Sequence, residues 1–259
     1  MKLRLRSAAI VLGVALGATA GTAFVADRML PPPLERLDSV STLVLDRNGR
    51  VLRAYTADEG AWRLPADLAQ TDPKLLHFLL AYEDQRFRAH PGVDVLAVAR
   101  ATWQAASHGR VVSGASTLTM QLARLMEPSR RTLGAKLAEM GRAQQIEQRL
   151  SKDEILGAYL TFAPYGGNLE GVRAASLAYL GKEPRRLTDA EAALLVALPQ
   201  APETVRPDRF PLAAKSARDK VLRLMLERGL IDARALETAL AEAVPEKRQE
   251  FPLSAPHLA

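Results

Sequence analysis

The stretch LLAYEDQRFRAHPGVD, residues 79–94, places two acidic residues directly after an apolar run. Glu83 follows Leu79 by four residues and Leu80 by three, so on a helix it extends the apolar face. A carboxylate on that face is partly desolvated, which raises its pKa toward the range that suits a general acid or base. Asp84, rotated by about 100° around the helix, is expected to be more exposed. An ordinary structural role stays open, because Glu83 could also cap the helix end or pair with Arg86.

The rest of the chain predicts a mainly α fold with a small β-hairpin. Asp72-Pro73 has the pattern of a helix start, and Ser151 to Glu154 and Thr188 to Glu191 have the pattern of capping boxes. Long helical patterns cover residues 133–150 and 217–230. Residues 41–55 contain two short β-prone runs around Asn48-Gly49, which favours a hairpin with a type I′ turn.

The N-terminus has the features of a membrane anchor. Basic residues at positions 2, 4 and 6 precede an uncharged segment, residues 8–25. As a helix, this segment spans roughly 27 Å, close to the ~30 Å core of a bilayer. The basic flank predicts a cytoplasmic N-terminus and a domain outside the cytoplasm. A cleaved signal peptide is the alternative, because ATAGTA, residues 18–23, offers small residues for cleavage.

The predicted organisation therefore has five parts. A cytoplasmic basic tail (residues 1–7) leads into one transmembrane helix (8–25) and a linker that contains Pro31 to Pro33 (26–40). The folded domain covers residues 41–245, and a frayed tail follows over 246–259.

Composition excludes several kinds of chemistry. The net charge of +6 suits a nucleic acid, an anionic membrane surface or a phosphate-bearing substrate. The chain has no cysteine, which excludes disulfides, thiolate catalysis and cysteine-based metal sites. Its 4 histidines form no HExxH motif, so a histidine-built metal site is not expected.

Three further stretches could carry function. SGASTLTMQLARL, residues 113–125, offers Ser116 as a helix N-cap and anion site, although a plain loop-to-helix junction has the same pattern. Glu139 and Glu147 lie eight residues apart on one helical pattern and could supply a second carboxylate or simply form a solvated face. Residues 161–182 contain a glycine-rich turn, but without GxxxxGK[ST] it gives little support for nucleotide binding.

Four ordered motifs together resemble the family 51 glycosyltransferases, the peptidoglycan glycosyltransferases that occur alone or as N-terminal domains of class A penicillin-binding proteins. They are EDQRFRAHPGVD (83–94), GASTLTMQLAR (114–124), SKDEILGAYL with PYGGNLEGVRAASLAYLGK (151–182), and EAALLVALPQAPETVRPDRFP (191–211). The resemblance covers about residues 40–235. The last motif and Arg124 look closest to the C subtype.

The resemblance implies a lysozyme-like, mainly α fold with a small membrane-associated subdomain. It implies polymerisation of lipid II, with inversion, on the outer face of the bacterial cytoplasmic membrane. Glu83 matches the catalytic base, which takes the proton from the acceptor 4-hydroxyl. Glu139 matches the second catalytic glutamate, near the departing pyrophosphate or a divalent metal (Mg or Mn), although no cofactor is firmly implied. Substrate contacts are expected at Asp84, Phe87, His90, Ser116, Thr117, Gln121, Arg124, Lys136 and Arg218.

The implied partners are lipid II, the growing glycan chain, the cytoplasmic membrane and other cell wall synthesis proteins, with no nucleic acid. The chain departs from the usual pattern at Ala115, Ala138 and Thr161, where relatives often carry Gly, Lys and Asn. It also lacks SxxK, SDN and KTG, so no penicillin binding is expected. A lysozyme-like glycan hydrolase and a non-catalytic, membrane-tethered lipid II or glycan-binding protein stay open as alternatives.

Overall fold

The computed structural model describes residue 28 and residues 30–49, 51–108, 116–130 and 132–251. The chain divides into a short unit, residues 1–33, and a large unit, residues 34–259, which contains every element described below. The predicted basic tail and anchor lie outside the described residues. Within the residues that are described, no helix combines the length and apolarity needed to cross a membrane.

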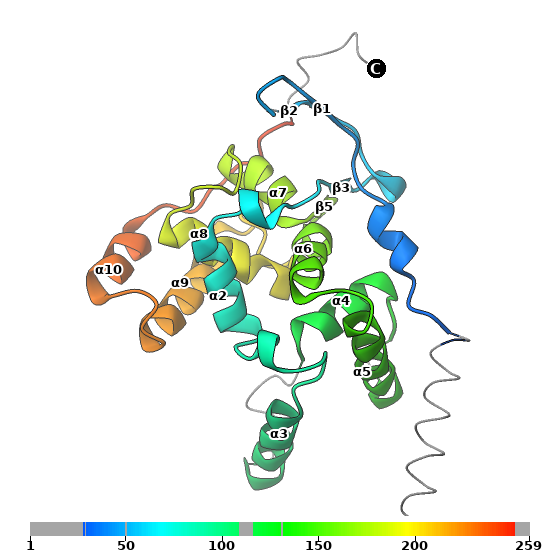
Figure 1. Ribbon diagram of the computed structural model, residues 1–259. Coiled ribbons are helices and arrows are strands. Elements are labelled where there is room, and N and C mark those ends of the chain that lie inside the picture. The colour runs from blue at the N-terminus through cyan, green and yellow to red at the C-terminus, as the bar shows by residue number, and fades with distance from the viewer. Residues whose placement is uncertain (1–27, 29, 50, 109–115, 131, 252–259) are drawn as a thin grey trace, which may run out of the picture. The chain divides into compact units, whose positions relative to one another are not determined.

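The large unit is mainly helical (Figure 1). Its α-helices are α2 (Pro73–Glu83), α3 (Val95–His108), α4 (Leu118–Met126), α5 (Leu133–Glu147), α6 (Lys152–Phe162), α7 (Val172–Ala175), α8 (Asp189–Ala197), α9 (Pro211–Glu227) and α10 (Ala233–Ala241). Its strands are β1 (Leu43–Leu45), β2 (Val51–Ala54), β3 (Trp62–Arg63), β4 (Pro164–Gly166) and β5 (Leu169–Glu170). Short 3₁₀ segments include η4 (Phe87–Ala89) and η6 (Leu198–Gln200), and η5 (Ser176–Leu180) is a π-helical turn that continues α7.

Local sequence signals determine most helix starts. The side chain of Asp72 caps α2 ahead of Pro73, and the predicted capping boxes open α6 at Ser151 and α8 at Thr188. The predicted cap of α4 was wrong by one residue. Thr117, not Ser116, is the N-cap, and its hydroxyl accepts a hydrogen bond from the Met120 N–H at 3.1 Å.

The predicted hairpin is present, but its turn differs from the prediction. β1 and β2 pair antiparallel, and the Gly49 N–H donates to the Asp46 carbonyl at 2.9 Å. Gly49 has a positive φ of 78°, whereas Asn48 does not, so the turn is not type I′. A second small sheet, in the order β3-β5-β4, was not predicted. Its strands are two or three residues long, too short for a period of two to be visible in the sequence.

The core forms around α8. All its residues except Asp189 and Glu191 are buried, which explains why this helix has no polar face. It packs against α2 and α9, and one apolar cluster continues from these helices to α4 and α6 (Figure 1). α8 therefore fixes the end of α2, where Glu83 lies.

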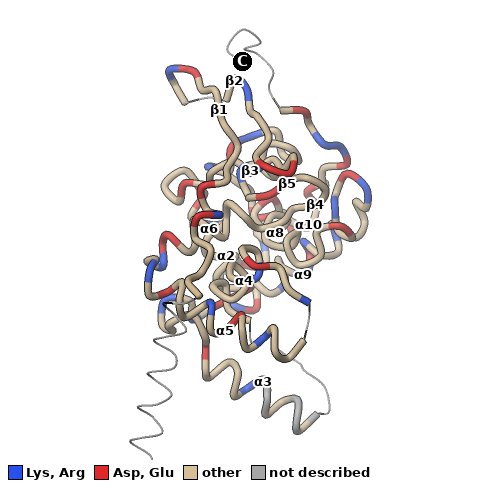
Figure 2. The backbone as a smooth tube through the Cα atoms, turned by 90° about the vertical axis from the view of Figure 1, so that its right-hand side faces the viewer, with Lys and Arg blue, Asp and Glu red and all other residues tan. Residues whose placement is uncertain are grey.

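α3 extends away from the core helices (Figure 1), and the tube shows no charge along most of this helix (Figure 2). Arg100 is the only Lys, Arg, Asp or Glu within its bounds, and Trp103 is exposed. Residues 246–251, predicted as part of a frayed tail, instead contact the domain. The Gln249 N–H donates to the Ala178 carbonyl at 2.7 Å, and Phe251 stacks on Trp62 with ring centroids 4.4 Å apart.

Candidate active site

The Glu83 carboxylate lies at the C-terminal end of α2, where amide groups from two other elements reach it. The Gln121 Nε2 of α4 donates to the Glu83 Oε2 at 2.8 Å, and the side-chain amide of Gln200, the last residue of η6, donates to Oε1. The hydroxyl of Tyr159 donates in turn to the Gln121 Oε1 at 3.3 Å, which fixes the orientation of that amide. Both carboxylate oxygens are thus bound by neutral donors.

The pKa of Glu83 is raised above its ordinary value, in the direction that the sequence predicted. Burial is the main cause, and the charge of Asp84 acts in the same direction. The two amide donors and the Arg124 guanidinium act in the opposite direction, because they stabilise the charged form. This balance suits a general base, which must be ionised yet basic near neutral pH.

Glu83 faces a polar cleft of about 820 Å³. The cleft brings together six of the residues predicted from the sequence. They come from the end of α2, the segment before α4, α4 itself and α5: Glu83, Ser116, Gln121, Arg124, Lys136 and Glu139. Two cations of the cleft, Arg124 and Lys136, would favour a phosphate-bearing ligand.

Lys136, in the first turn of α5, binds two polar side chains of the cleft. Its Nζ donates to the Ser116 Oγ at 2.6 Å and to the Glu139 Oε2 at 3.0 Å. These contacts connect the first turn of α5 to the segment that precedes α4. Ala138, where relatives often carry Lys, is exposed on α5, so the family's additional cation has no counterpart at that position.

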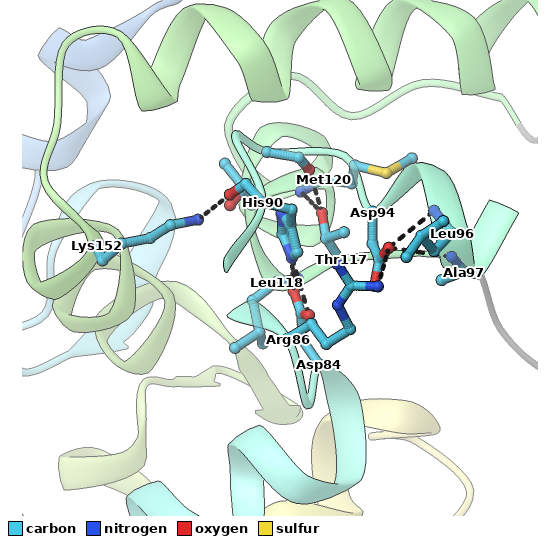
Figure 3. A network of polar contacts seen from close by, with 12 residues as sticks. Asp84, Arg86, His90, Asp94, Leu96, Ala97, Thr117, Leu118, Met120 and Lys152 are labelled. Atoms are coloured by element: carbon cyan, nitrogen blue, oxygen red, sulfur yellow. Dashed lines mark hydrogen bonds and ion pairs between the residues drawn. The ribbon is translucent and has the colours of Figure 1, made fainter. Parts of the chain in front are cut away.

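A buried polar network lies beside the cleft (Figure 3). Both carboxylate oxygens of Asp84 lie 3.0 Å from the His90 Nε2. The Asp84 Oδ2 also accepts a hydrogen bond from the Leu118 N–H at 3.1 Å. Asp84 is only 7% exposed, contrary to the prediction. It is the C-cap of α2, with φ −156°, so the chain has already left the helix and the helical rotation does not apply.

The predicted substrate contacts at Asp84, Phe87, His90 and Thr117 are not supported by these positions. None of the four lines the cleft, and all four are buried. Thr117 caps α4 while its hydroxyl donates to the Gly92 carbonyl at 2.6 Å. Phe87 belongs to the main apolar core. These residues instead connect α2 and α4, the helices that carry Glu83 and Gln121.

Lys152 extends the network on the other side of His90. Its Nζ lies 4.4 Å from the centre of the Phe87 ring and donates to the His90 carbonyl at 2.7 Å (Figure 3). It also donates to the Glu147 Oε1 at 2.6 Å, and the Thr119 hydroxyl donates to the same oxygen at 2.6 Å. Glu147 is therefore bound within the structure and does not form a solvated face with Glu139.

Arg218 is not part of the cleft, so its predicted role as a substrate contact is corrected. Its side chain, 1% exposed, donates to the Asp219 Oδ1 from Nε at 3.0 Å and from Nη2 at 2.8 Å. Further bonds reach the carbonyl oxygens of Glu242 at 2.6 Å and Leu240 at 3.3 Å. Arg218 thereby attaches the C-terminal end of α10 to α9.

Glu139 is the predicted candidate for a metal ligand. Its carboxylate is paired with Lys136, and no group of three or more His, Asp or Glu residues suited to a metal occurs in the described part of the chain. One carboxylate paired with an ammonium group is not a metal site by itself.

The sequence analysis missed Gln200 and Tyr159, whose side chains contact Glu83 or its partner. Gln200 lies within a quoted motif, but nothing local marks it as a neighbour of a residue 117 positions earlier. Thr161, a departure from the usual Asn, is buried, and its hydroxyl donates to the Gly157 carbonyl at 2.8 Å and accepts the Ala66 N–H at 3.1 Å. Position 115 lies outside the described residues.

Comparisons with known proteins agree with the motifs. A sequence model of the transglycosylase family matches residues 48–226. Penicillin-binding protein 1C of Escherichia coli is 44% identical over 90% of this chain, and penicillin-binding protein 1A of the same organism is 39% identical over 76%. The crystal structure of penicillin-binding protein 1A from Haemophilus influenzae aligns with 82% of this chain and 22% of its own, at 22% identity and a TM-score of 0.46.

The curated relatives are much longer, since the chain spans 30% of penicillin-binding protein 1C and 23% of penicillin-binding protein 1A from Escherichia coli. The family match covers well over half of this chain and includes the cleft. The chain therefore belongs to the transglycosylase family, the peptidoglycan glycosyltransferases of family 51.

Proposed function

We propose that this protein polymerises lipid II into glycan strands for the cell wall, with Glu83 as the general base. The observation that carries the proposal is the state of Glu83: a partly buried carboxylate with a raised pKa, bound by two amides, at the edge of a cleft that contains Arg124 and Lys136. Family membership supports the same reaction. The helical domain, with the Glu83 carboxylate at the end of α2, supports a lysozyme-like fold.

In this mechanism Glu83 accepts the proton of the acceptor 4-hydroxyl while that oxygen forms a bond to the anomeric carbon of the donor, with inversion. The bond from the anomeric carbon to the lipid pyrophosphate breaks, and the pyrophosphate leaves with the electron pair. Arg124 and Lys136 offset its growing negative charge through charge-assisted hydrogen bonds. The Lys136 Nζ also donates to the Glu139 Oε2 at 3.0 Å. In this mechanism Glu139 therefore orients the ammonium group of Lys136 toward the leaving group.

The lipid-linked donor requires the site to work at a membrane. We infer that residues 8–25 anchor the chain in the cytoplasmic membrane, with the domain on the outer face. Lipid II and the growing glycan are its partners, and other cell wall synthesis proteins could join it there. Glu139 is the carboxylate that would face a divalent ion beside the leaving group, and no step above depends on such an ion.

Purified full-length protein incubated with labelled lipid II tests the proposal. New glycan polymer that is absent with Glu83→Gln supports it. Shortening of preformed glycan without polymerisation would favour the hydrolase, for which two carboxylates in a lysozyme-like site would account. Binding of lipid II without turnover in either protein would favour a non-catalytic role.

A further inference from the structure

Gln200 occupies a distinctive position for a surface glutamine. It is exposed, it ends the short helix η6, and together with Pro199 it lines the cleft opposite α4 and α5. Its amide donates to the Glu83 Oε1, and within the described residues it forms no other hydrogen bond. Among the described residues, the side-chain amide of Gln200 therefore binds only the Glu83 carboxylate.

The backbone of Gln200 is attached to the best-packed part of the domain. η6 continues directly from α8, and Leu198 at its start is fully buried. α8 packs against α2, the helix that ends at Glu83. The end of α2 and the end of η6 are thus fixed relative to each other through the core. The side-chain amide of Gln200 therefore reaches Glu83 from a fixed backbone position.

The two donors to Glu83 differ in their surroundings. Gln121 is partly buried, and its own oxygen accepts the Tyr159 hydroxyl, so its amide is fixed on the Oε2 side. Gln200 approaches Oε1 from the exposed side, where a substrate hydroxyl would arrive. The geometry points to Gln200 as a positioning residue that holds Oε1 toward the cleft and favours the ionised form of Glu83.

This inference rests on the proposed function, since it gives Gln200 a task in the same proton transfer. A hydrogen bond to a carboxylate stabilises the charged form and so lowers its pKa. Gln200 thereby opposes the effect of burial, which raises the pKa of Glu83. Without this donor, the carboxylate would bind a proton at higher pH and would be a base in a smaller fraction of molecules.

Other charged and titratable groups also face Glu83 and must stay constant in a test. Asp84 raises its pKa and Arg124 lowers it, and the phenol groups of Tyr82 and Tyr159 interact with it electrostatically. Lys136 and Glu139 line the same cleft. A substitution at Gln200 leaves all of these residues in place, so a difference between variants at this position reports the lost or altered donor.

The test compares Gln200→Ala and Gln200→Lys with the wild type in full-length protein. Carbon NMR of protein labelled at glutamate carboxyl groups, with Glu83→Gln to assign the signal, measures the pKa of Glu83 directly. We expect Gln200→Ala to raise the pKa of Glu83, because a donor to the charged form is lost, and Gln200→Lys, which adds a positive charge, to lower it. Thr204→Ala is the matched control, because Thr204 lies in the segment between η6 and α9 but outside the cleft. This substitution should leave the pKa of Glu83 unchanged.

The pH dependence of kcat/KM with lipid II gives the second readout. Its acidic limb should move to higher pH in Gln200→Ala and to lower pH in Gln200→Lys, because only ionised Glu83 accepts the proton. Equal Glu83 titration in Gln200→Ala and the wild type would overturn the inference, whatever the activity. If the titration shifts as expected but the wild type forms no polymer, the proposed function fails while the position of Gln200 beside Glu83 stands.

Discussion

Replacement of Asp84 by alanine should destabilise the domain strongly, although Asp84 adjoins the proposed catalytic base. Its carboxylate is the acceptor for the Leu118 N–H at 3.1 Å and for the His90 Nε2 at 3.0 Å. The other ring nitrogen of His90, Nδ1, is buried with no partner among the described residues, so the ring has no second hydrogen bond to replace the lost one. Asp84→Ala leaves two buried donors unsatisfied.

Each buried donor without an acceptor costs about 1–3 kcal/mol, so the free energy of unfolding should fall by about 2–6 kcal/mol. In a domain of this size, each kcal/mol corresponds to roughly 2–4 °C in melting temperature. Urea unfolding followed by circular dichroism at pH 7 measures the loss. Asp84→Asn should lose less, because its one carbonyl oxygen can still accept the Leu118 N–H.

Arg88→Ala is the control for this measurement. Arg88 forms an ion pair with Asp153 at 2.7 Å, but their side chains are 59% and 64% exposed. An exposed pair contributes about 0–1 kcal/mol, so the variant should unfold close to the wild type. If Asp84→Ala loses no more stability than Arg88→Ala, then the network does not connect α2 and α4 as described.

Three further predictions separate catalysis from stability. Arg124→Ala should lower kcat with lipid II by on the order of 10²-fold, because one cation near the leaving group is lost. The melting temperature should not change, and full turnover would contradict the role of Arg124 in binding the pyrophosphate. Arg218→Ala should instead lower the free energy of unfolding by roughly 3–5 kcal/mol, because Asp219 loses its buried partner and keeps only the half-exposed Lys215. Urea unfolding like that of the wild type would contradict this. Glu83→Gln should be more stable than the wild type at pH 8 by roughly 0.5–2 kcal/mol but not at pH 4. Burial raises the pKa of Glu83 in the native state, so the wild type loses stability as pH rises from the unfolded to the native pKa, whereas glutamine does not titrate. Thermal unfolding at the two pH values measures the difference, and a wild type that is the more stable protein at pH 8 would refute it.

Helix starts were predictable because their signals are local. A capping side chain and its partner lie three residues apart, so Ser151 with Glu154 and Thr188 with Glu191 carry the whole motif in the sequence. The β3-β5-β4 sheet carries no such signal, since it pairs two-residue strands more than 100 residues apart.

The candidate site was predictable where the apolar face of a helix carried the information. Glu83 followed from the spacing of leucines, whereas Asp84 was wrongly expected to be exposed because the helix ends between the two. Arg218 was assigned by resemblance, and sequence alone does not reveal that Asp219 and the end of α10 enclose its guanidinium. Gln200 was missed because its proximity to Glu83 arises only from the packing of α8 on α2.

The rate of glycan elongation by Glu83→Gln tests the central claim most directly. The substitution keeps the size of the side chain but removes the base, so kcat with lipid II should fall by about 10²–10⁴-fold while lipid II still binds. Ser107→Ala, an exposed residue of α3 outside the cleft, should elongate glycan at the wild-type rate. A Glu83→Gln protein that retained wild-type elongation would contradict the assignment of Glu83 as the general base.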